Sequence, residues 1–265
     1  MYSLVLLLLF QLFASPQACT TTLVTAEASS NRSPMCSHSN DGDGDVAGTL
    51  RHIPASDHPP TSTRAVSGGT IPQVPHTYQY KTEGYSVMNE YSVGLCESTC
   101  RSKFNSSHGD GNNGILNIVD LSQLALERSK TALEAVETMG ELAEKYGYRD
   151  AGESMLVVDS NSSWIFHVLP DDSGAGAIWV AQRVMGSEMA TVANAFIIQD
   201  VVFPLDGSTL FLGSSNLKPI AEKHGWYDSS DPSFNFAYIY SWGELGPKYN
   251  TGRRMWHSFM LLSPT

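Results

Sequence analysis

The chain has 265 residues, with 16 Lys and Arg against 27 Asp and Glu, and therefore a formal net charge of −11. Because 42% of the residues are hydrophobic and only 16% are charged, the composition is that of a globular protein and excludes a disordered one. The acidic balance disfavours nucleic acid and anionic lipid as partners, since both present negative phosphates.

The first 18 residues are predicted to be a secretory signal peptide. Residues 4–13 form an apolar run interrupted only by Gln11, which is shorter than the roughly 20 residues that span a bilayer. An uncleaved anchor and a lipoprotein leader are weaker alternatives, because the run is short and Pro16 stands where a lipoprotein leader has an aliphatic residue. We therefore expect a secreted or lumenal protein, extracellular or lysosomal, without stable membrane insertion after cleavage.

Two further features bear on export. Asn-x-Ser/Thr triplets predict a glycoprotein, and they begin at Asn31, Asn105 and Asn161. An even number of cysteines in an oxidising compartment indicates disulfides, and the chain has four: Cys19, Cys36, Cys96 and Cys100.

Cleavage after Ala18 makes Cys19 the first residue of the mature chain. A terminal cysteine carries a thiol of ordinary pKa about 8.5 beside an α-amine of about 7.7–8.0, so the amine can accept the thiol proton near neutral pH. Cys19 is thus a candidate nucleophile that brings its own base, and the alternative is an ordinary core or disulfide cysteine. If Cys19 is catalytic, the other three cysteines form at most one disulfide within the chain.

The N-terminal part of the mature chain is predicted to be extended. Residues 19–24 and 35–39 have strand character and flank a turn at 31–34, which predicts a hairpin with Cys19 on a strand. Residues 40–76 are rich in Asp, Gly, Pro, Ser and Thr, which predicts loops with short extended pieces at a substrate-facing rim. Residues 85–99 return to strand character around 88–95.

The middle of the chain is predicted to be helical. Apolar or small residues recur at spacings of three and four between 117 and 148, so this region forms one long or two consecutive amphipathic helices that end at Gly147. The runs 154–159, 164–169, 177–184 and 189–202 then predict an antiparallel meander. Strands, helices and strands in this order place the chain in the α+β class.

The chain lacks the characteristic sequence motifs of several metal-binding and enzyme classes. Residues 41–45 resemble the start of a calcium loop, but the twelfth position is His52 where an EF-hand has Glu. The chain has no H-E-x-x-H, no G-x-S-x-G and no G-x-x-x-x-G-K-[ST] motif. We therefore expect no metal and no cofactor.

A set of short segments occurs in an informative order: 19–24 (CTTTLV), 88–91 (MNEY) with 97–99 (EST), 124–128 (LALER), 179–184 (WVAQRV), 192–196 (VANAF), 221–226 (AEKHGW) and 249–254 (YNTGRR). Together they resemble the N-terminal-cysteine dipeptidases, which include bacterial dipeptidase A and the secernins. Penicillin V acylase and bile salt hydrolase are more distantly similar. The resemblance implies the N-terminal-nucleophile (Ntn) hydrolase fold, a four-layer αββα sandwich over residues 19–265, and a cysteine-type dipeptidase.

The resemblance also implies roles for four catalytic residues. Cys19 would supply the thiolate and the α-amine, and Asp41 would hold that amine and stabilise its charged form. Asn194 would donate a hydrogen bond to the oxyanion. Arg254 would orient the catalytic groups, and its planar fork is also suited to a dipeptide carboxylate.

Two further positions are expected to contact a small peptide substrate. His38 stands where the acylases have Arg, and Thr99 stands where they place another oxyanion donor. Taken singly, most of the candidate site residues would be given simpler roles, such as a helix cap for Asn194 or a surface ion pair for Arg254. The order of the motifs along the chain favours the catalytic roles instead.

The chain stops soon after Arg254, whereas dipeptidases of this family continue. We therefore expect the C-terminal part of the family domain, with further strands and helices, to be missing and the sandwich to be incomplete. Two alternatives stay open: an N-acyl amide hydrolase of the penicillin V acylase type, and a truncated, non-catalytic secreted binding protein. A homo-oligomer also stays open.

Overall fold

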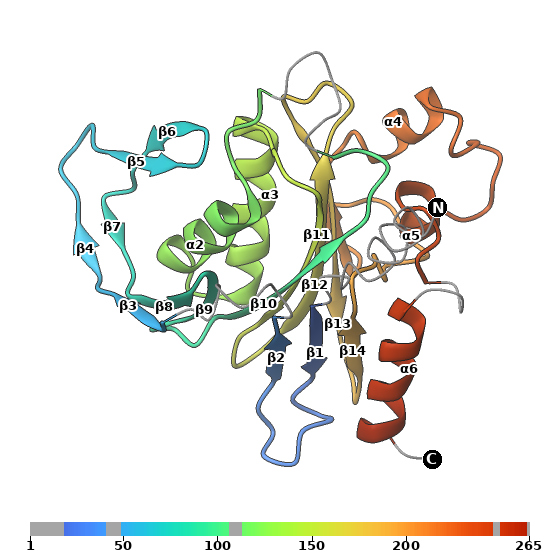
Figure 1. Ribbon diagram of the computed structural model, residues 1–265, viewed down its shortest axis with the longest axis horizontal. Coiled ribbons are helices and arrows are strands. Elements are labelled where there is room, and N and C mark those ends of the chain that lie inside the picture. The colour runs from blue at the N-terminus through green and yellow to red at the C-terminus, as the bar shows by residue number, and fades with distance from the viewer. Residues whose placement is uncertain (1–18, 41–48, 106–112, 246–249, 264–265) are drawn as a thin grey trace, which may run out of the picture.

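The computed structural model describes residues 19–40, 49–105, 113–245 and 250–263, and its largest element is an antiparallel sheet (Figure 1). Eight strands form this sheet: β3 (Arg51–Ile53), β8 (Tyr80–Glu83), β9 (Tyr85–Asn89), β10 (Gly94–Cys100), β11 (Gly152–Val158), β12 (Ser163–Pro170), β13 (Ala177–Val184) and β15 (Phe211–Gly213). Their order across the sheet is β15-β13-β12-β11-β10-β9-β8-β3. The predicted meander is confirmed for β11, β12 and β13, which pair in sequence order.

A second sheet packs on one face of the first. It contains β1 (Thr20–Val24), β2 (Met35–Ser39) and β14 (Met189–Val192), in the order β14-β1-β2. Leu23 of this sheet is fully buried in one hydrophobic cluster with Leu156 of the large sheet. Burying a leucine side chain in this way contributes roughly 1.5–3 kcal/mol, so such contacts hold the two sheets together.

Two helices cover the opposite face of the large sheet, α2 (Ile118–Arg128) and α3 (Ala132–Tyr146) (Figure 1). Asn117 and Asp120 form a reciprocal capping box at the start of α2, which satisfies backbone donors that the helix leaves open. Gly147 ends α3 with a φ of 74°, as predicted from its position. A β-carbon at Gly140 would clash with the Trp179 ring, so the absence of a side chain lets α3 approach the sheet.

Small strand pairs extend this helical side of the molecule. They are β4 (Ser56–Asp57) with β7 (His76–Thr77) and β5 (Thr63–Val66) with β6 (Gly69–Pro72). Arg64 of β5 reaches α2, where its Nε lies 3.2 Å from Oε2 of Glu127. These pieces confirm the short extended segments predicted within 40–76, although residues 41–48 lie outside the described residues.

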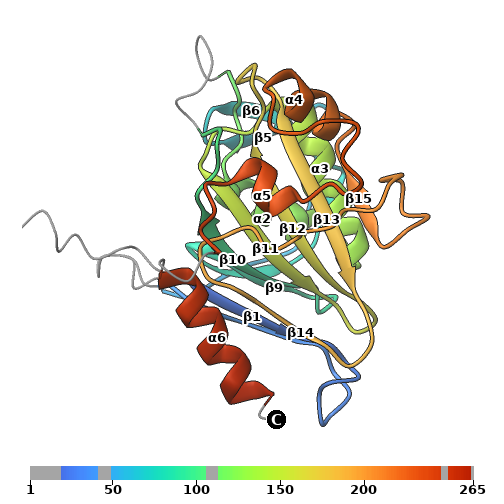
Figure 2. The same ribbon diagram turned by 90° about the vertical axis from the view of Figure 1, so that its right-hand side faces the viewer.

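The remaining helices follow the sheets in the chain: α4 (Leu217–Lys223), α5 (Phe236–Tyr240) and α6 (Asn250–Leu262). Figure 2 shows α6 running alongside the small sheet, where it contacts β14. The structure thus confirms a mixed fold of helices and a large antiparallel sheet, and the four-layer sandwich remains a prediction. Among the described residues, no helix has the length and apolar character required to cross a membrane.

Two strand predictions were wrong in their extent. The run 189–202 is a strand only to Val192, because Asn194 has a φ of 60° and turns the chain away from the sheet. The stretch 85–99 is divided into β9 and β10 by a turn in which Asn89 Oδ1 accepts hydrogen bonds from the amides of Tyr91 and Val93. In both places a local hydrogen bond or backbone conformation overrides a β-branched composition.

Candidate active site

Cys19 lies directly before β1, the central strand of the small sheet. The strand register sets its neighbours: Thr20 pairs with Ser39 of β2, and Thr21 pairs with Val192 of β14. Continued to Cys19, these registers place Asn40 on one side of it and Asn194 on the other. The Cys19 side chain is buried, and its Sγ donates a long hydrogen bond of 3.9 Å to Oδ1 of Asn40.

Asn194 is held in a fixed orientation just after β14. Its backbone N–H donates to Oγ of Ser98 at 3.1 Å, and its Nδ2 donates to the carbonyl oxygen of Thr99 at 2.6 Å. An amide NH₂ has two donors. The second donor of Asn194 makes no hydrogen bond within the described part of the chain, so it is available to a ligand beside Cys19.

Arg254, on α6, joins the two sides of the site. Its Nη1 donates to the carbonyl oxygen of Cys19 at 2.6 Å and to Oγ1 of Thr20 at 3.0 Å. Its Nη2 donates to the carbonyl oxygen of Ala193 at 3.0 Å and to Oδ1 of Asn194 at 2.8 Å. Both arms of the fork are thus engaged with the protein, which fits the predicted orienting role better than the binding of a substrate carboxylate.

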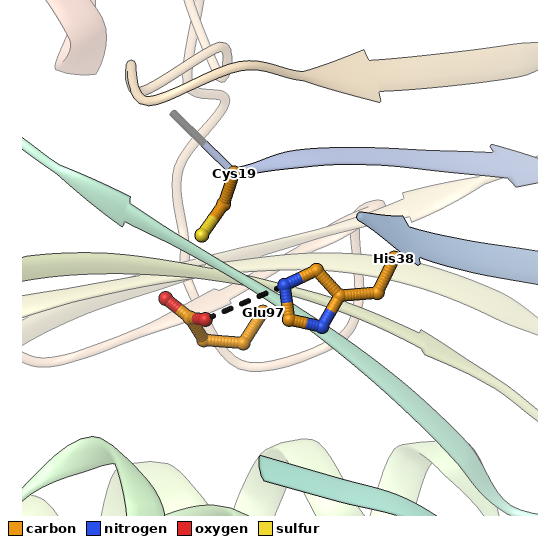
Figure 3. A group of neighbouring side chains, drawn as sticks. All are labelled: Cys19, His38 and Glu97. Carbon is orange, nitrogen blue, oxygen red and sulfur yellow. Dashed lines mark ion pairs between the residues drawn. The ribbon is translucent and has the colours of Figure 1, made fainter. Parts of the chain in front are cut away.

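His38 and Glu97 complete the surroundings of the thiol (Figure 3). His38 Nε2 lies 3.7 Å from Oε2 of Glu97. Sγ of Cys19, a ring nitrogen of His38 and a carboxylate oxygen of Glu97 all lie within 4.8 Å of one another. Glu97 is buried, whereas the His38 side chain is 17% exposed. The His38 ring also packs edge-on against Tyr85, with 5.6 Å between ring centroids.

A second buried carboxyl group lies behind Glu97. Burial, followed by the negative charge of Glu97, raises the pKa of Glu153 well above its ordinary range. Oγ1 of Thr99 donates to Oε1 of Glu97 at 3.1 Å, which engages the hydroxyl that was predicted as an oxyanion donor.

A cavity of about 760 Å³ lies beside this cluster, between β2 and the β9–β10 pair. His38 and Asn40 line it beside the site, and Met35, Leu95 and Glu83 are among the residues that line the rest. The wall is mixed, with apolar and acidic side chains. The cavity has the size that small ligands occupy in proteins, roughly 300–1,000 Å³.

The model of peptidase family C69 matches residues 18–265. The chain belongs to peptidase family C69. This family comprises the dipeptidase A and secernin-like cysteine peptidases, so the resemblance stated from the sequence motifs is confirmed. Membership identifies the chain as a cysteine peptidase, and the match begins one residue before Cys19.

In this C69 peptidase, most of the predicted site residues lie together. The structure brings together Cys19, His38, Thr99, Asn194 and Arg254, although they come from distant parts of the chain. Asp41, the predicted partner of the α-amine, lies outside the described residues. The roles of all six remain predictions.

Sequence reasoning assigned no side-chain role to Glu97 or Glu153 of the C69 peptidase. Both carboxyl groups are almost completely buried within strands whose neighbours are also buried. A carboxyl group is rarely buried without a partner, so an acidic residue inside a mostly apolar strand is a signal that the sequence does offer.

Proposed function

We propose that the protein is a dipeptidase that uses N-terminal Cys19 as its nucleophile. The observation that carries the proposal is the position of Arg254, which donates at once to the Cys19 carbonyl oxygen and to the Asn194 side chain. A single side chain thereby fixes the nucleophile's backbone relative to a hydrogen-bond donor. This is the arrangement that acyl transfer requires.

In the first step the α-amine of Cys19 takes the thiol proton, and the thiolate forms a bond to the carbonyl carbon of the substrate. The carbonyl π electrons move onto oxygen, and the second N–H of Asn194 stabilises that oxyanion. One such donor is worth roughly 3–4 kcal/mol in an acyl-transfer transition state.

In the second step the tetrahedral intermediate expels the leaving amine. The protonated α-amine of Cys19 returns its proton to the leaving nitrogen as the C–N bond breaks, which leaves a thioester on Cys19. Water then attacks the thioester carbonyl carbon, and the C–S bond breaks to release the acid and restore the thiol. No cofactor is required for this sequence.

The fold and location in this proposal follow from the resemblance. The helices α2 and α3, the two sheets and α6 would form the four layers of an αββα sandwich, with Cys19 between the sheets. Removal of residues 1–18 during export would expose the α-amine, and the acidic surface agrees with a secreted or lumenal protein that binds small peptides.

The test is hydrolysis by protein whose first residue is Cys19, measured on a panel of free dipeptides and a panel of N-acyl amino acids. We expect dipeptide hydrolysis, and we expect Cys19→Ala to abolish it while the circular dichroism spectrum is unchanged. Hydrolysis of the N-acyl panel alone would favour an amide hydrolase. Absence of hydrolysis by the folded protein would favour a binding protein.

A further inference from the structure

We propose that Cys19, His38 and Glu97 form a binding site for a divalent zinc ion that blocks the nucleophile. The binding itself depends only on the geometry of these three side chains. Its consequence, reversible inhibition, rests on the proposed function. The site differs from a cofactor site because the ion occupies the thiol that the reaction needs.

The three donor atoms are already close to the separation that zinc requires. Tetrahedral zinc with bonds of about 2.0–2.3 Å places its ligand atoms roughly 3.5 Å apart. His38 Nε2 and Glu97 Oε2 are 3.7 Å apart, and Cys19 Sγ lies within 4.8 Å of a ring nitrogen of His38 and of a carboxylate oxygen of Glu97. A side-chain rotation that moves the thiol by about 1 Å would complete the triangle.

The chemistry of the donors selects zinc over the harder cations. Thiolate, imidazole and carboxylate are the ligand types of zinc, whereas calcium and magnesium take sets of oxygen ligands. Binding releases the Cys19 thiol proton to solvent as the S–Zn bond forms. The thiolate and the Glu97 carboxylate then balance the two charges of the ion.

Neighbouring groups hold the ligands in place. Glu97 Oε1 accepts from Thr99 at 3.1 Å, which leaves Oε2 directed toward His38. The His38 ring is braced by Tyr85. Such outer contacts orient metal ligands and reduce the reorganisation that binding requires.

An ion can reach the site through the cavity described above. His38 and Asn40 line that cavity, and the His38 side chain is partly exposed to it. The fourth position of a tetrahedral ion would face this opening and hold a water molecule or the α-amine of Cys19. An ion in that position would prevent the thiol from attacking a substrate carbonyl.

The experiment is a titration of protein that begins at Cys19 with Co²⁺, the spectroscopic substitute for zinc, followed by displacement with Zn²⁺. We expect one ion per chain, a thiolate-to-cobalt charge-transfer absorption, and its loss as zinc displaces cobalt. His38→Ala should weaken the binding at least about tenfold. The matched control is His76→Ala, because His76 also pairs with a carboxylate, Asp57, at 2.6 Å but lies far along the chain from Cys19.

The spectrum of the unmutated protein decides the proposal even if a variant fails to fold. Absence of the charge-transfer absorption, or equal weakening by His38→Ala and His76→Ala, would overturn it. The result is also independent of the proposed function. A charge-transfer absorption without dipeptide hydrolysis would support the metal site and reject the dipeptidase, and dipeptide hydrolysis without a charge-transfer absorption would do the reverse.

Discussion

Nη2 of Arg254 donates a hydrogen bond to Oδ1 of Asn194 at 2.8 Å, and this contact joins helix α6 to the turn that follows β14. The same guanidinium holds the carbonyl oxygen of Cys19. The position of the Asn194 amide relative to the thiol therefore depends on a residue 60 positions farther along the chain. This dependence makes the role of Arg254 testable.

Removal of the Arg254 side chain should reduce activity through misplacement of these groups. We expect Arg254→Ala to lower kcat/KM for dipeptides about 100-fold, because small displacements of reacting groups have effects of this size. Arg253→Ala is the matched control, since Arg253 is exposed on the same helix turn and should have activity close to that of the unmutated protein. Equal losses in both variants would contradict the orienting role.

Loss of the Asn194 amide should affect the chemical step more than binding. We expect kcat to fall about 10²–10³-fold with little change in KM, as for other oxyanion donors. Asn194 has a φ of 60°, so Asn194→Gly is the informative variant because glycine adopts this conformation without strain. Asn194→Ala should lose the same activity but also unfold more easily. Full activity in the glycine variant would reject Asn194 as the oxyanion donor.

His167 should make the protein less stable in mild acid. Burial lowers the pKa of His167 to about 3, and its Nε2 accepts hydrogen bonds from the amides of Ile197 at 3.0 Å and Ile198 at 3.2 Å. The unfolded chain takes up this proton below about pH 6.5, whereas the folded chain resists it. The free energy of unfolding should therefore fall as the pH is lowered, by about 2 kcal/mol between about pH 7 and pH 5.

The measurement is urea unfolding at several pH values. His167→Gln keeps an acceptor for the two amides but cannot titrate, so its unfolding free energy should vary less over this range. His76→Gln, at an exposed site, should retain the slope of the unmutated protein. If the slopes of all three proteins coincide, His167 is not the group responsible.

Cys36 and Cys96 should form a disulfide when the protein is exposed to oxidised glutathione. No disulfide joins any of the four cysteines, and a hydrogen bond with Cys36 is the main cause of a raised pKa at Cys96. The two residues also pack together between the sheets. Thiols titrated in denaturant should fall from four to two, with oxidised glutathione taking up the two electrons.

This disulfide would close a loop of roughly 60 residues and stabilise the protein by about 4 kcal/mol through the unfolded chain. The measurement is the urea midpoint before and after oxidation. Cys36→Ser is the control and should show no shift. Four reactive thiols after prolonged oxidation would contradict the predicted pair.

Much of the fold could be predicted from local patterns. The β1–β2 hairpin, the two helices before Gly147 and the central meander all follow from periodicity and from turn residues. The extent of β14 could not be predicted, because the turn at Asn194 depends on hydrogen bonds with Ser98 and Thr99, which come from another sheet. Composition alone gives no account of such a contact.

The site could be predicted only in part, because some of its contacts join residues that are distant in the chain. Cys19 is marked by its place after the predicted leader, and the motifs indicated Asn194 and Arg254. The buried pair of Glu97 and Glu153 was missed because only strand pairing brings these residues together, with Thr99 opposite Glu153 in the register. The sequence shows both acidic residues but does not show that they lie close together in the fold.

The central claim is that Cys19 acts as an N-terminal nucleophile, and a single added residue tests it most directly. Dipeptide hydrolysis should be compared between protein that begins at Cys19 and protein that carries one glycine before it. The extended protein retains its thiol, which alkylation with iodoacetamide verifies, but it lacks the α-amine of Cys19. We predict that the extension lowers kcat at least about 100-fold, the scale of a lost general base. Equal turnover by the two proteins would contradict the account.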